Sequence, residues 1–262
     1  MHSNAVDPVA LATVLDDARA LRRAVAPPPD LAGCTLRDAY AIQDALVARR
    51  ERSGERRSGW KLGITSPIKQ QVMGIDHPLF GRLFATGVRA CGSVIARDAF
   101  IAPRIEPEIA FGLAAPLEPG MDRDVLLRSI AWIAPALEIT DGRYLPGKRT
   151  AVELVADNTA AAGYVLGERQ PYDGAPVAAY PTELICNGEI RERGITADVL
   201  GDPIHALVLL AAHLAERGLR TAAGDIVLSG AITDAIPVEP GASVEARLAG
   251  LGSARIAFAP AG

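Results

Sequence analysis

The chain has 262 residues, with 27 lysines and arginines against 31 aspartates and glutamates, and a formal net charge of −4. This length suits one large domain with an appendage, and it can bury a sizeable core. Because the two signs of charge nearly balance, no field of one sign is available to hold a nucleic-acid backbone or an anionic membrane, and we expect neither as a partner.

The N-terminal part is predicted to be helical. Apolar residues recur at helical spacing over residues 7–23, a run of three prolines at 27–29 breaks the pattern, and a second helical pattern covers residues 35–50. Residues 49–57 mix both signs of charge with Ser and Gly, which favours a solvated loop. We therefore expect a helical cap over residues 1–58.

From Gly59 onward, short apolar runs separated by Gly and Pro predict a β-rich body. Asp202 and Pro203 are typical of a helix start, and they predict one helix within this body that stops at Gly218. The fold class is therefore α+β, with residues 59–262 as one β-rich catalytic domain. The expected strands are 60–64, 93–95, 105–113, 132–139, 163–166, 224–230, 236–238, 242–248 and 254–258.

Two of these strands carry three glutamates. Alternate side chains of a strand share a face, so Glu106 and Glu108 are expected to point the same way. Glu138 lies in an apolar run, where an ionised carboxylate costs several kcal/mol unless a positive charge compensates it. Mg²⁺ and Mn²⁺ prefer oxygen ligands, and three glutamates leave positions open for water or substrate. We predict a divalent-metal site here, with a solvated strand face as the alternative.

An anionic substrate would need positive charge near these carboxylates, because three carboxylates leave a divalent ion with a net negative charge. Lys61 and Arg104 are the basic residues available near the glutamates. Lys61, which lies in the segment 59–63, is the better candidate.

Five segments in chain order resemble the motifs of one family. Together they resemble the 2-oxopent-4-enoate hydratase and 4-oxalocrotonate decarboxylase family, within the fumarylacetoacetate hydrolase superfamily, over nearly the whole chain. The resemblance implies a mixed β-sandwich or β-roll core, a divalent metal, and substrates from the meta-cleavage breakdown of aromatic compounds. The segments are Gly59–Ser66, Met73–Gly81, Pro103–Phe111, Pro135–Glu138 and Val155–Asn158.

The resemblance also implies roles for single residues. The glutamates 106, 108 and 138 fall on the family's metal ligands, and Lys61 falls on its substrate-contacting lysine. Asp76 falls on an active-site acid, although an Asx-turn is an alternative role for this residue. Thr159 lies in a region that the family places beside the substrate, and Thr233 lies in a segment similar to its late glycine-rich turn. Ordinary turns remain the alternative for both threonines.

Two further segments resemble members of the family that handle dicarboxylates. They are Thr65–Ser66 with Lys69, and Ile139–Tyr144. A second carboxylate would need a second cation, which Arg143 could supply unless it is an exposed loop arginine. We therefore expect Thr65 and Arg143, with Thr159 and Thr233, to bind substrate.

The activity implied is that of a lyase. A divalent ion on the C1 carboxylate and C2 oxygen of a 2-hydroxydienoate would act as a Lewis acid and stabilise enolate-like charge. Water could then add at C4, with Asp76 accepting a proton and Lys61 stabilising the oxyanion. We predict a hydratase that makes a 4-hydroxy-2-oxo acid. A 4-oxalocrotonate-type decarboxylase, an acylpyruvate C–C hydrolase and a non-catalytic partner subunit remain alternatives.

Location and partners complete these expectations. Cys34, Cys91 and Cys186 are widely spaced and form no CxxC pair, which fits a reduced cytoplasm. Residues 1–4 lack the pattern of a secretory signal, and no run approaches the roughly 20 apolar residues of a membrane span. We expect a cytoplasmic homo-oligomer that acts on a small 2-oxo or 2-hydroxydienoic acid, and association with a related decarboxylase or hydratase remains open.

Overall fold

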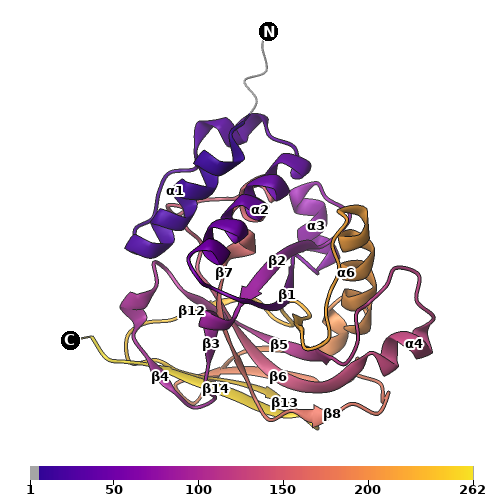
Figure 1. Cartoon of the computed structure of the whole chain (residues 1–262). Helices are drawn as coiled ribbons and strands as arrows, with labels where there is room; N and C mark the ends of the chain where they lie inside the picture. The colour runs from indigo at the N-terminus through magenta and orange to yellow at the C-terminus, as the bar shows by residue number, and fades with distance from the viewer. Residues whose placement is uncertain (1–5, 262) are drawn as a thin grey trace.

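A computed structural model describes residues 6–261, so the expectation about residues 1–4 lies outside the described range. Two β-sheets form the body, and helices cover one side of the larger sheet (Figure 1). The α-helices of the described range are α1 (Pro8–Leu21), α2 (Leu36–Arg52), α3 (Pro67–Met73), α4 (Arg123–Arg128), α5 (Ala151–Ala156) and α6 (Ile204–Glu216).

The strands fall into a larger and a smaller sheet. The larger sheet contains β1 (Arg57–Gly63), β2 (Leu79–Phe84), β3 (Val88–Arg89), β5 (Arg104–Leu113), β6 (Ile130–Thr140), β7 (Ala161–Leu166), β8 (Gln170–Pro171), β11 (Ile226–Leu228) and β12 (Ile236–Pro237). The smaller sheet contains β4 (Val94–Ile95), β9 (Pro181–Cys186), β10 (Glu189–Ile195), β13 (Ser243–Leu248) and β14 (Gly252–Phe258).

The larger sheet runs in the order β2-β1-β11-β5-β6-β7-β3, with β12 paired to β5 and β8 paired to β6. It is mixed, because β1 pairs with β11 and β3 pairs with β7 in parallel, whereas β5 pairs with β6 in antiparallel fashion. The long β5–β6 pair lies at its centre. Residues far apart in the chain therefore meet across these two strands.

The smaller sheet packs against the larger one, and both contribute to the larger of two hydrophobic clusters among the described residues. Leu137 of β6 belongs to the same buried cluster as Val244 and Ile256, which come from β13 and β14. This is a sandwich of two mixed sheets (Figure 1). The predicted α+β class with a β-sandwich core is confirmed.

Helices α1 and α2 pack on each other beside the larger sheet (Figure 1). Asp7 caps α1, and Thr35 forms a capping box with Asp38 at the start of α2, so local sequence signals set both starts. The prediction of a solvated loop at 49–57 is wrong in part, because α2 continues through Arg52. In addition, Arg50 is buried, and its Nη2 lies 2.7 Å from Oε2 of Glu55. The division into a cap and a catalytic domain at residue 58 stays a prediction.

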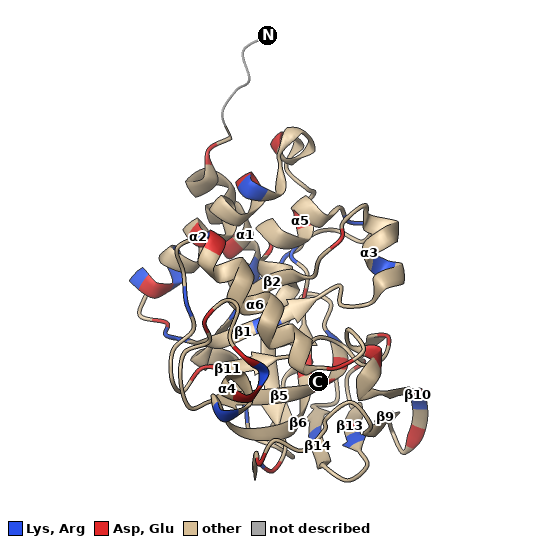
Figure 2. Ribbon diagram, turned by 90° about the vertical axis from the view of Figure 1, so that its right-hand side faces the viewer, with Lys and Arg blue, Asp and Glu red and all other residues tan. Residues whose placement is uncertain are grey.

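Acidic and basic residues are interspersed along the ribbon (Figure 2). Within residues 6–261, every helix is too short or too polar to cross a bilayer.

Candidate active site

The three glutamates meet because of the register between β5 and β6. Glu106 stands directly opposite Glu138, and Glu108 stands opposite Ala136 two positions further along β5. Since alternate residues of a strand share a face, all three carboxylates project from the same face of the sheet. One carboxylate oxygen of each residue lies within 4.8 Å of the others.

Two of these carboxylates are buried without enough partners, and Glu106 is half-buried. Glu108 and Glu138 are fully buried, and Oε1 of each lacks a hydrogen-bond partner among the described residues. The other Glu108 oxygen, Oε2, accepts a hydrogen bond of 2.7 Å from the backbone N–H of Gly230. An unpaired buried oxygen is costly, and three such ligands suit a hard divalent cation. The geometry therefore fits the predicted metal ligands.

Lys61 is the cation of this cluster. Its Nζ lies 2.9 Å from Oε2 of Glu138 and donates a hydrogen bond of 3.2 Å to the carbonyl of Thr159. The side chain is buried, and β1 holds it two strands away from β5. Three carboxylates and one ammonium leave two negative charges, which one divalent ion would neutralise.

The proton affinities of these groups reflect burial and mutual charge. Burial raises the pKa of Glu138 to about 7, although the neighbouring Lys61 favours the ionised form. Burial and the charge of Glu138 raise the pKa of Glu108 well above its usual range. Burial disfavours the charged form of Lys61, but the glutamates outweigh it and raise the pKa of this lysine. The positive charge of Lys61 therefore offsets only part of the negative charge of the three glutamates.

A cavity of about 160 Å³ opens beside the cluster. Lys61 and Glu106 form its polar end, and residues from α3, α5 and the turn before β7 form its other walls. Thr65 and Thr159, both predicted to bind substrate, lie on this cavity. The remaining lining residues are Gly63, Ile64, Ser66, Lys69, Leu79, Thr140, Leu154, Ala160 and Ala231.

The segment 230–233 approaches the site through its backbone. Besides the contact of Gly230 with Glu108, a side chain at position 230 would lie 2.5 Å from the Thr65 methyl group, and the residue has a φ of 104°. Glycine is therefore required here. Thr233 is buried, but its hydroxyl donates to the Asp234 carbonyl and Ala231 lines the cavity in its place.

Asp76 lies on the exposed loop between α3 and β2 and outside the residues that line the cavity. Its predicted role as an active-site acid thus has no contact to support it in this arrangement of the loop. It stays a prediction.

Arg143 differs from the expectation most clearly. It is only 1% exposed, and its Nε lies 2.5 Å from Oδ1 of Asp157. The guanidinium also donates to backbone carbonyls and lies outside the cavity beside the glutamates. A role in receiving the distal carboxylate of a substrate therefore has no contact to support it and stays a prediction. The guanidinium is paired with Asp157, and the alternative of an exposed loop arginine is wrong.

Lys69 was part of a segment that resembles dicarboxylate-handling members of the family, but no role in the site was predicted for it. It lies on α3 next to Ser66, and its Nζ is 2.7 Å from Oδ1 of Asp234. Together with Lys61 it supplies the basic groups of the cavity wall. Its position three residues after the cavity-lining Ser66, one turn along a helix, was the available signal.

A buried carboxylate triad with a paired lysine, open to a small cavity, defines a divalent-metal enzyme site. The family model described as fumarylacetoacetate (FAA) hydrolase C-terminal matches residues 69–259. The chain therefore belongs to the fumarylacetoacetate hydrolase family, and the family predicted from the motifs is confirmed.

Two curated relatives are similar over most of their length. A 4-oxalocrotonate decarboxylase of Pseudomonas putida is 35% identical over 226 residues, which is 86% of each chain. A 2-keto-4-pentenoate hydratase of Burkholderia vietnamiensis is 35% identical over 252 residues, which is 95% of this chain and 96% of the relative. Both relatives are lyases, but they run different reactions.

Among solved structures, 4-oxalocrotonate decarboxylase from Pseudomonas putida G7, complexed with magnesium and adipate, superposes with a TM-score of 0.92. It is 32% identical and covers 96% of this chain and 97% of its own. The same enzyme complexed with calcium and acetate gives a TM-score of 0.90. These similarities and the glutamate cluster agree on a divalent metal.

Proposed function

We propose that the protein is a divalent-metal-dependent lyase of aromatic meta-cleavage catabolism. Its most favoured activity is addition of water to a 2-oxoenoate or 2-hydroxydienoate, which gives a 4-hydroxy-2-oxo acid. The observation that carries this proposal is the set of buried glutamate oxygens, short of partners, beside Lys61 at the end of a cavity.

Glu106, Glu108 and Glu138 would hold Mg²⁺ or Mn²⁺, and we favour Mg²⁺ because one structure of the decarboxylase from Pseudomonas putida G7 is a complex with magnesium. A bound divalent ion supplies Lewis-acid polarisation of a 2-oxo group. Small oxo acids, the substrates for which the relatives are named, suit a cavity of about 160 Å³.

The chain's own groups supply orientation and charge. The Lys61 ammonium is held between Glu138 and the Thr159 carbonyl, where it can stabilise oxyanion charge on the substrate. The hydroxyl of Thr65 faces the same cavity and can donate to a substrate oxygen. For Asp76 to accept a proton from water, its loop must first carry it over the cavity.

A dicarboxylate substrate is favoured by one observation. Lys69 brings a second ammonium to the cavity, where Lys61 already faces the glutamates. We propose that Lys69, rather than Arg143, binds the distal carboxylate of the substrate. This carboxylate would compete with Asp234 for the Lys69 ammonium. The Lys69→Met variant should then lose preference for a dioate over the matching monoacid by about ten- to a hundredfold, since a charge-assisted contact contributes roughly 1.5–3 kcal/mol. Equal preference in both proteins would reject the assignment.

Decarboxylation is the second candidate activity, because two of the relatives above act as 4-oxalocrotonate decarboxylases. Both reactions use the same stabilisation of enolate charge. One experiment separates them: Mg²⁺-loaded protein is incubated with a 2-oxoenedioate in ¹⁸O-labelled water, and products and CO₂ are measured. A hydratase incorporates label at C4 without CO₂, whereas stoichiometric CO₂ would overturn our choice. An acylpyruvate cleaved while dienoates remain intact would favour C–C hydrolysis.

The remaining expectations belong to this proposal. We expect a cytoplasmic homo-oligomer, which can associate with a related decarboxylase or hydratase. Sedimentation of the protein alone and mixed with such a partner tests both statements. Absence of turnover on every oxo acid would leave the non-catalytic partner subunit as the better description.

A further inference from the structure

One segment beside the cavity has an unusual backbone. Asn158, Thr159 and Ala160 are consecutive non-glycine residues with φ of 51°, 50° and 59°. Left-handed conformations are unfavourable for each such residue and occur mostly as single residues. A run of three persists only where the surrounding structure holds it.

This turn, residues 158–160, serves the site directly. The Thr159 carbonyl accepts the hydrogen bond from Lys61, and Thr159 and Ala160 both line the cavity. The turn also fits closely against β2. A Cβ at Gly81 would lie 2.3 Å from the Thr159 hydroxyl and 3.1 Å from Cδ of Lys61. A change in the turn would therefore move both the cavity wall and the lysine.

The Asn158 side chain holds one side of the turn. Its Oδ1 accepts a hydrogen bond of 2.8 Å from the backbone N–H of Arg82, and its Nδ2 donates one of 2.9 Å to the carbonyl of the same residue. The amide thus pairs with β2 as a further strand would.

Arg143 donates hydrogen bonds to the residues on both sides of the 158–160 turn. Its Nη2 donates to the carbonyl of Asp157, which precedes the turn, at 2.5 Å. Its Nη1 donates to the carbonyl of Ala161, which follows the turn, at 3.3 Å, and to that of Asp141 at 2.7 Å. The Asp157 carboxylate in turn faces the guanidinium and accepts the backbone N–H of Arg143 at 2.9 Å. One guanidinium therefore brackets the turn.

A fully buried ion pair is a poor source of stability, because desolvation offsets its Coulomb attraction. Arg143 and Asp157 are each 1% exposed, and only arginine offers donors that can reach three carbonyls and a carboxylate at once. We infer that Arg143 and Asp157 are positioning residues that hold the 158–160 turn left-handed and so place the Thr159 carbonyl against Lys61. This inference goes beyond the proposed function, which assigns neither residue a part.

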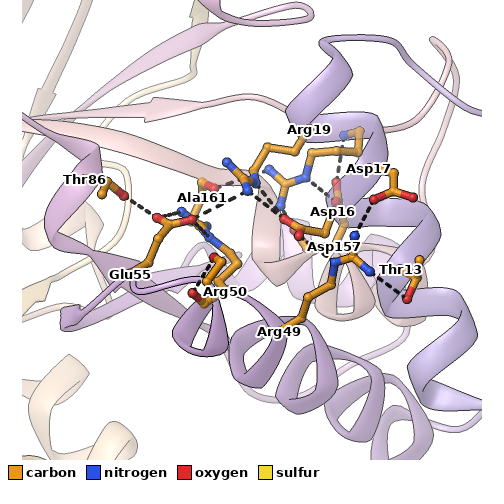
Figure 3. Close-up of polar contacts among 12 residues, drawn as sticks. Thr13, Asp16, Asp17, Arg19, Arg49, Arg50, Glu55, Thr86, Asp157 and Ala161 are labelled. Carbon is orange, nitrogen blue, oxygen red and sulfur yellow. Dashed lines mark hydrogen bonds and ion pairs between the residues drawn. The ribbon is translucent and has the colours of Figure 1, made fainter.

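The neighbourhood offers a matched control. Figure 3 draws Asp157 together with Arg50 of α2 and Glu55, which follows that helix. Arg50, Glu55 and Arg143 line one cavity of about 320 Å³. Arg50 is buried, and its Nη2 lies 2.7 Å from Oε2 of Glu55, but it makes no hydrogen bond or ion pair with residues 158–160 in the described structure. Arg50→Lys therefore disturbs a buried pair in the same region without touching residues 158–160.

The first test measures the turn without any substrate. Carbon-13 chemical shifts of the Ala160 Cα and Cβ report its backbone conformation in uniformly labelled protein. In Arg143→Lys, we expect these shifts to move or the signals to broaden, because a single ammonium cannot span the carbonyls. In Arg50→Lys they should stay at their wild-type values. Unchanged Ala160 shifts in Arg143→Lys, or equal changes in both variants, would overturn the inference.

The second test asks whether positioning affects catalysis. Arg143→Lys should lower turnover about ten- to a hundredfold, because a misplaced reacting group costs about that much. Arg50→Lys should keep most of its turnover even if it loses a similar amount of thermal stability. Affinity for Mg²⁺ by calorimetry should hold in both variants, because the ligands lie on β5 and β6. Loss of turnover in proportion to stability in both would indicate a structural role only.

The outcomes separate this inference from the proposed function. If wild-type protein turns over no oxo acid, the proposed function fails, yet the Ala160 shifts still decide whether Arg143 holds the turn. If Arg143→Lys does not fold, Asp157→Asn replaces it, since asparagine keeps the shape but loses the charge that faces the guanidinium. Wild-type Ala160 shifts in Asp157→Asn would overturn the inference as well.

Discussion

The metal cluster depends on a pairing of single residues across two strands. Glu106 and Glu138 face each other directly, an arrangement that repulsion between like charges disfavours unless a cation lies between them. Lys61 supplies part of that charge and is itself buried. The site is therefore built to accept further positive charge.

The ligand assignment predicts the effect of removing one charge at a time. Glu106→Gln, Glu108→Gln and Glu138→Gln should each weaken Mg²⁺ binding at least about tenfold, because even residues that only support ligands contribute that much. Calorimetric titration measures the affinity. Glu118→Gln, at an exposed position, should bind as the wild type does. Unaltered affinity in all three ligand variants would remove the assignment.

Lys61 has a different expected role. Lys61→Met removes the ammonium beside Glu138 but no ligand oxygen, so Mg²⁺ binding should persist and turnover should fall about a hundredfold or more. Paired calorimetry and steady-state kinetics check this split. If the variant lost metal and turnover together, Lys61 would be part of the metal environment and not a substrate contact.

At the scale of elements, β1, β2 and the 158–160 turn fit closely enough to exclude a methyl group at Gly81. Gly81 of β2 pairs directly with Lys61 of β1, and its missing side chain makes room for Thr159.

Gly81→Ala should therefore destabilise the protein by about 1–3 kcal/mol, the usual range for overpacking, and should impair turnover because Thr159 and Lys61 must both shift. Gly33→Ala is the matched control, since nothing lies within 4 Å of its added methyl group. Denaturant unfolding and kinetics of both variants test the expectation. Wild-type stability in Gly81→Ala would show that the turn is mobile.

The helices and strands also show how much of the fold could be predicted from the sequence. Periodicity and caps predicted α1, α2 and α6 to within a few residues. Apolar runs predicted the strands β5 and β6, and alternation along β5 placed Glu106 and Glu108 on one face, but the pairing of the two strands comes from the structure. The hairpin of β9 and β10 was missed because its outer strand is polar and largely exposed, so apolar alternation gave no signal. The short helices α3 and α5 also lacked enough turns to show a period.

Arg143 could not be assigned from sequence for a related reason. Residues 141–144 have the composition of a turn, and an arginine there is ordinarily exposed. Its partner Asp157 lies on the far side of α5, and the two meet only because β6 and β7 pair. Likewise, no local signal marks three left-handed residues at Asn158–Ala160. Both the burial of Arg143 and the backbone conformation of residues 158–160 follow from tertiary packing alone.

At the scale of the whole molecule, two sheets share the larger hydrophobic cluster and the site lies at the centre of the larger sheet. The charge state of its buried carboxylates therefore affects the stability of the fold. Without a cation they oppose folding in their ionised state, and with one they become ligands.

This coupling predicts a dependence on pH. The pKa of Glu138 is raised by burial to about 7, whereas an unfolded glutamate ionises near 4.3, so between these values the folded state holds more protons. The free energy of unfolding of metal-free protein should fall as pH rises through this window. Burial raises the pKa of Asp157 to about 6, which acts in the same direction.

Stabilisation by Mg²⁺ should grow over the same window, because the ion needs ionised carboxylates. Thermal unfolding with chelator and with saturating Mg²⁺, at about pH 5 and about pH 7.5, measures both effects. The Glu138→Gln variant should show a smaller loss of stability with pH. A metal-independent melting temperature at the higher pH would contradict the coupling.

The central claim is that three glutamates from two strands hold one divalent ion at the end of the cavity. Anomalous X-ray scattering from a crystal soaked with Mn²⁺ tests it most directly. We expect one strong peak bounded by oxygens of Glu106, Glu108 and Glu138 at about 2.0–2.2 Å, with Lys61 displaced toward the Thr159 carbonyl. Absence of a peak there at saturating Mn²⁺, or a peak held by other residues, would contradict the account.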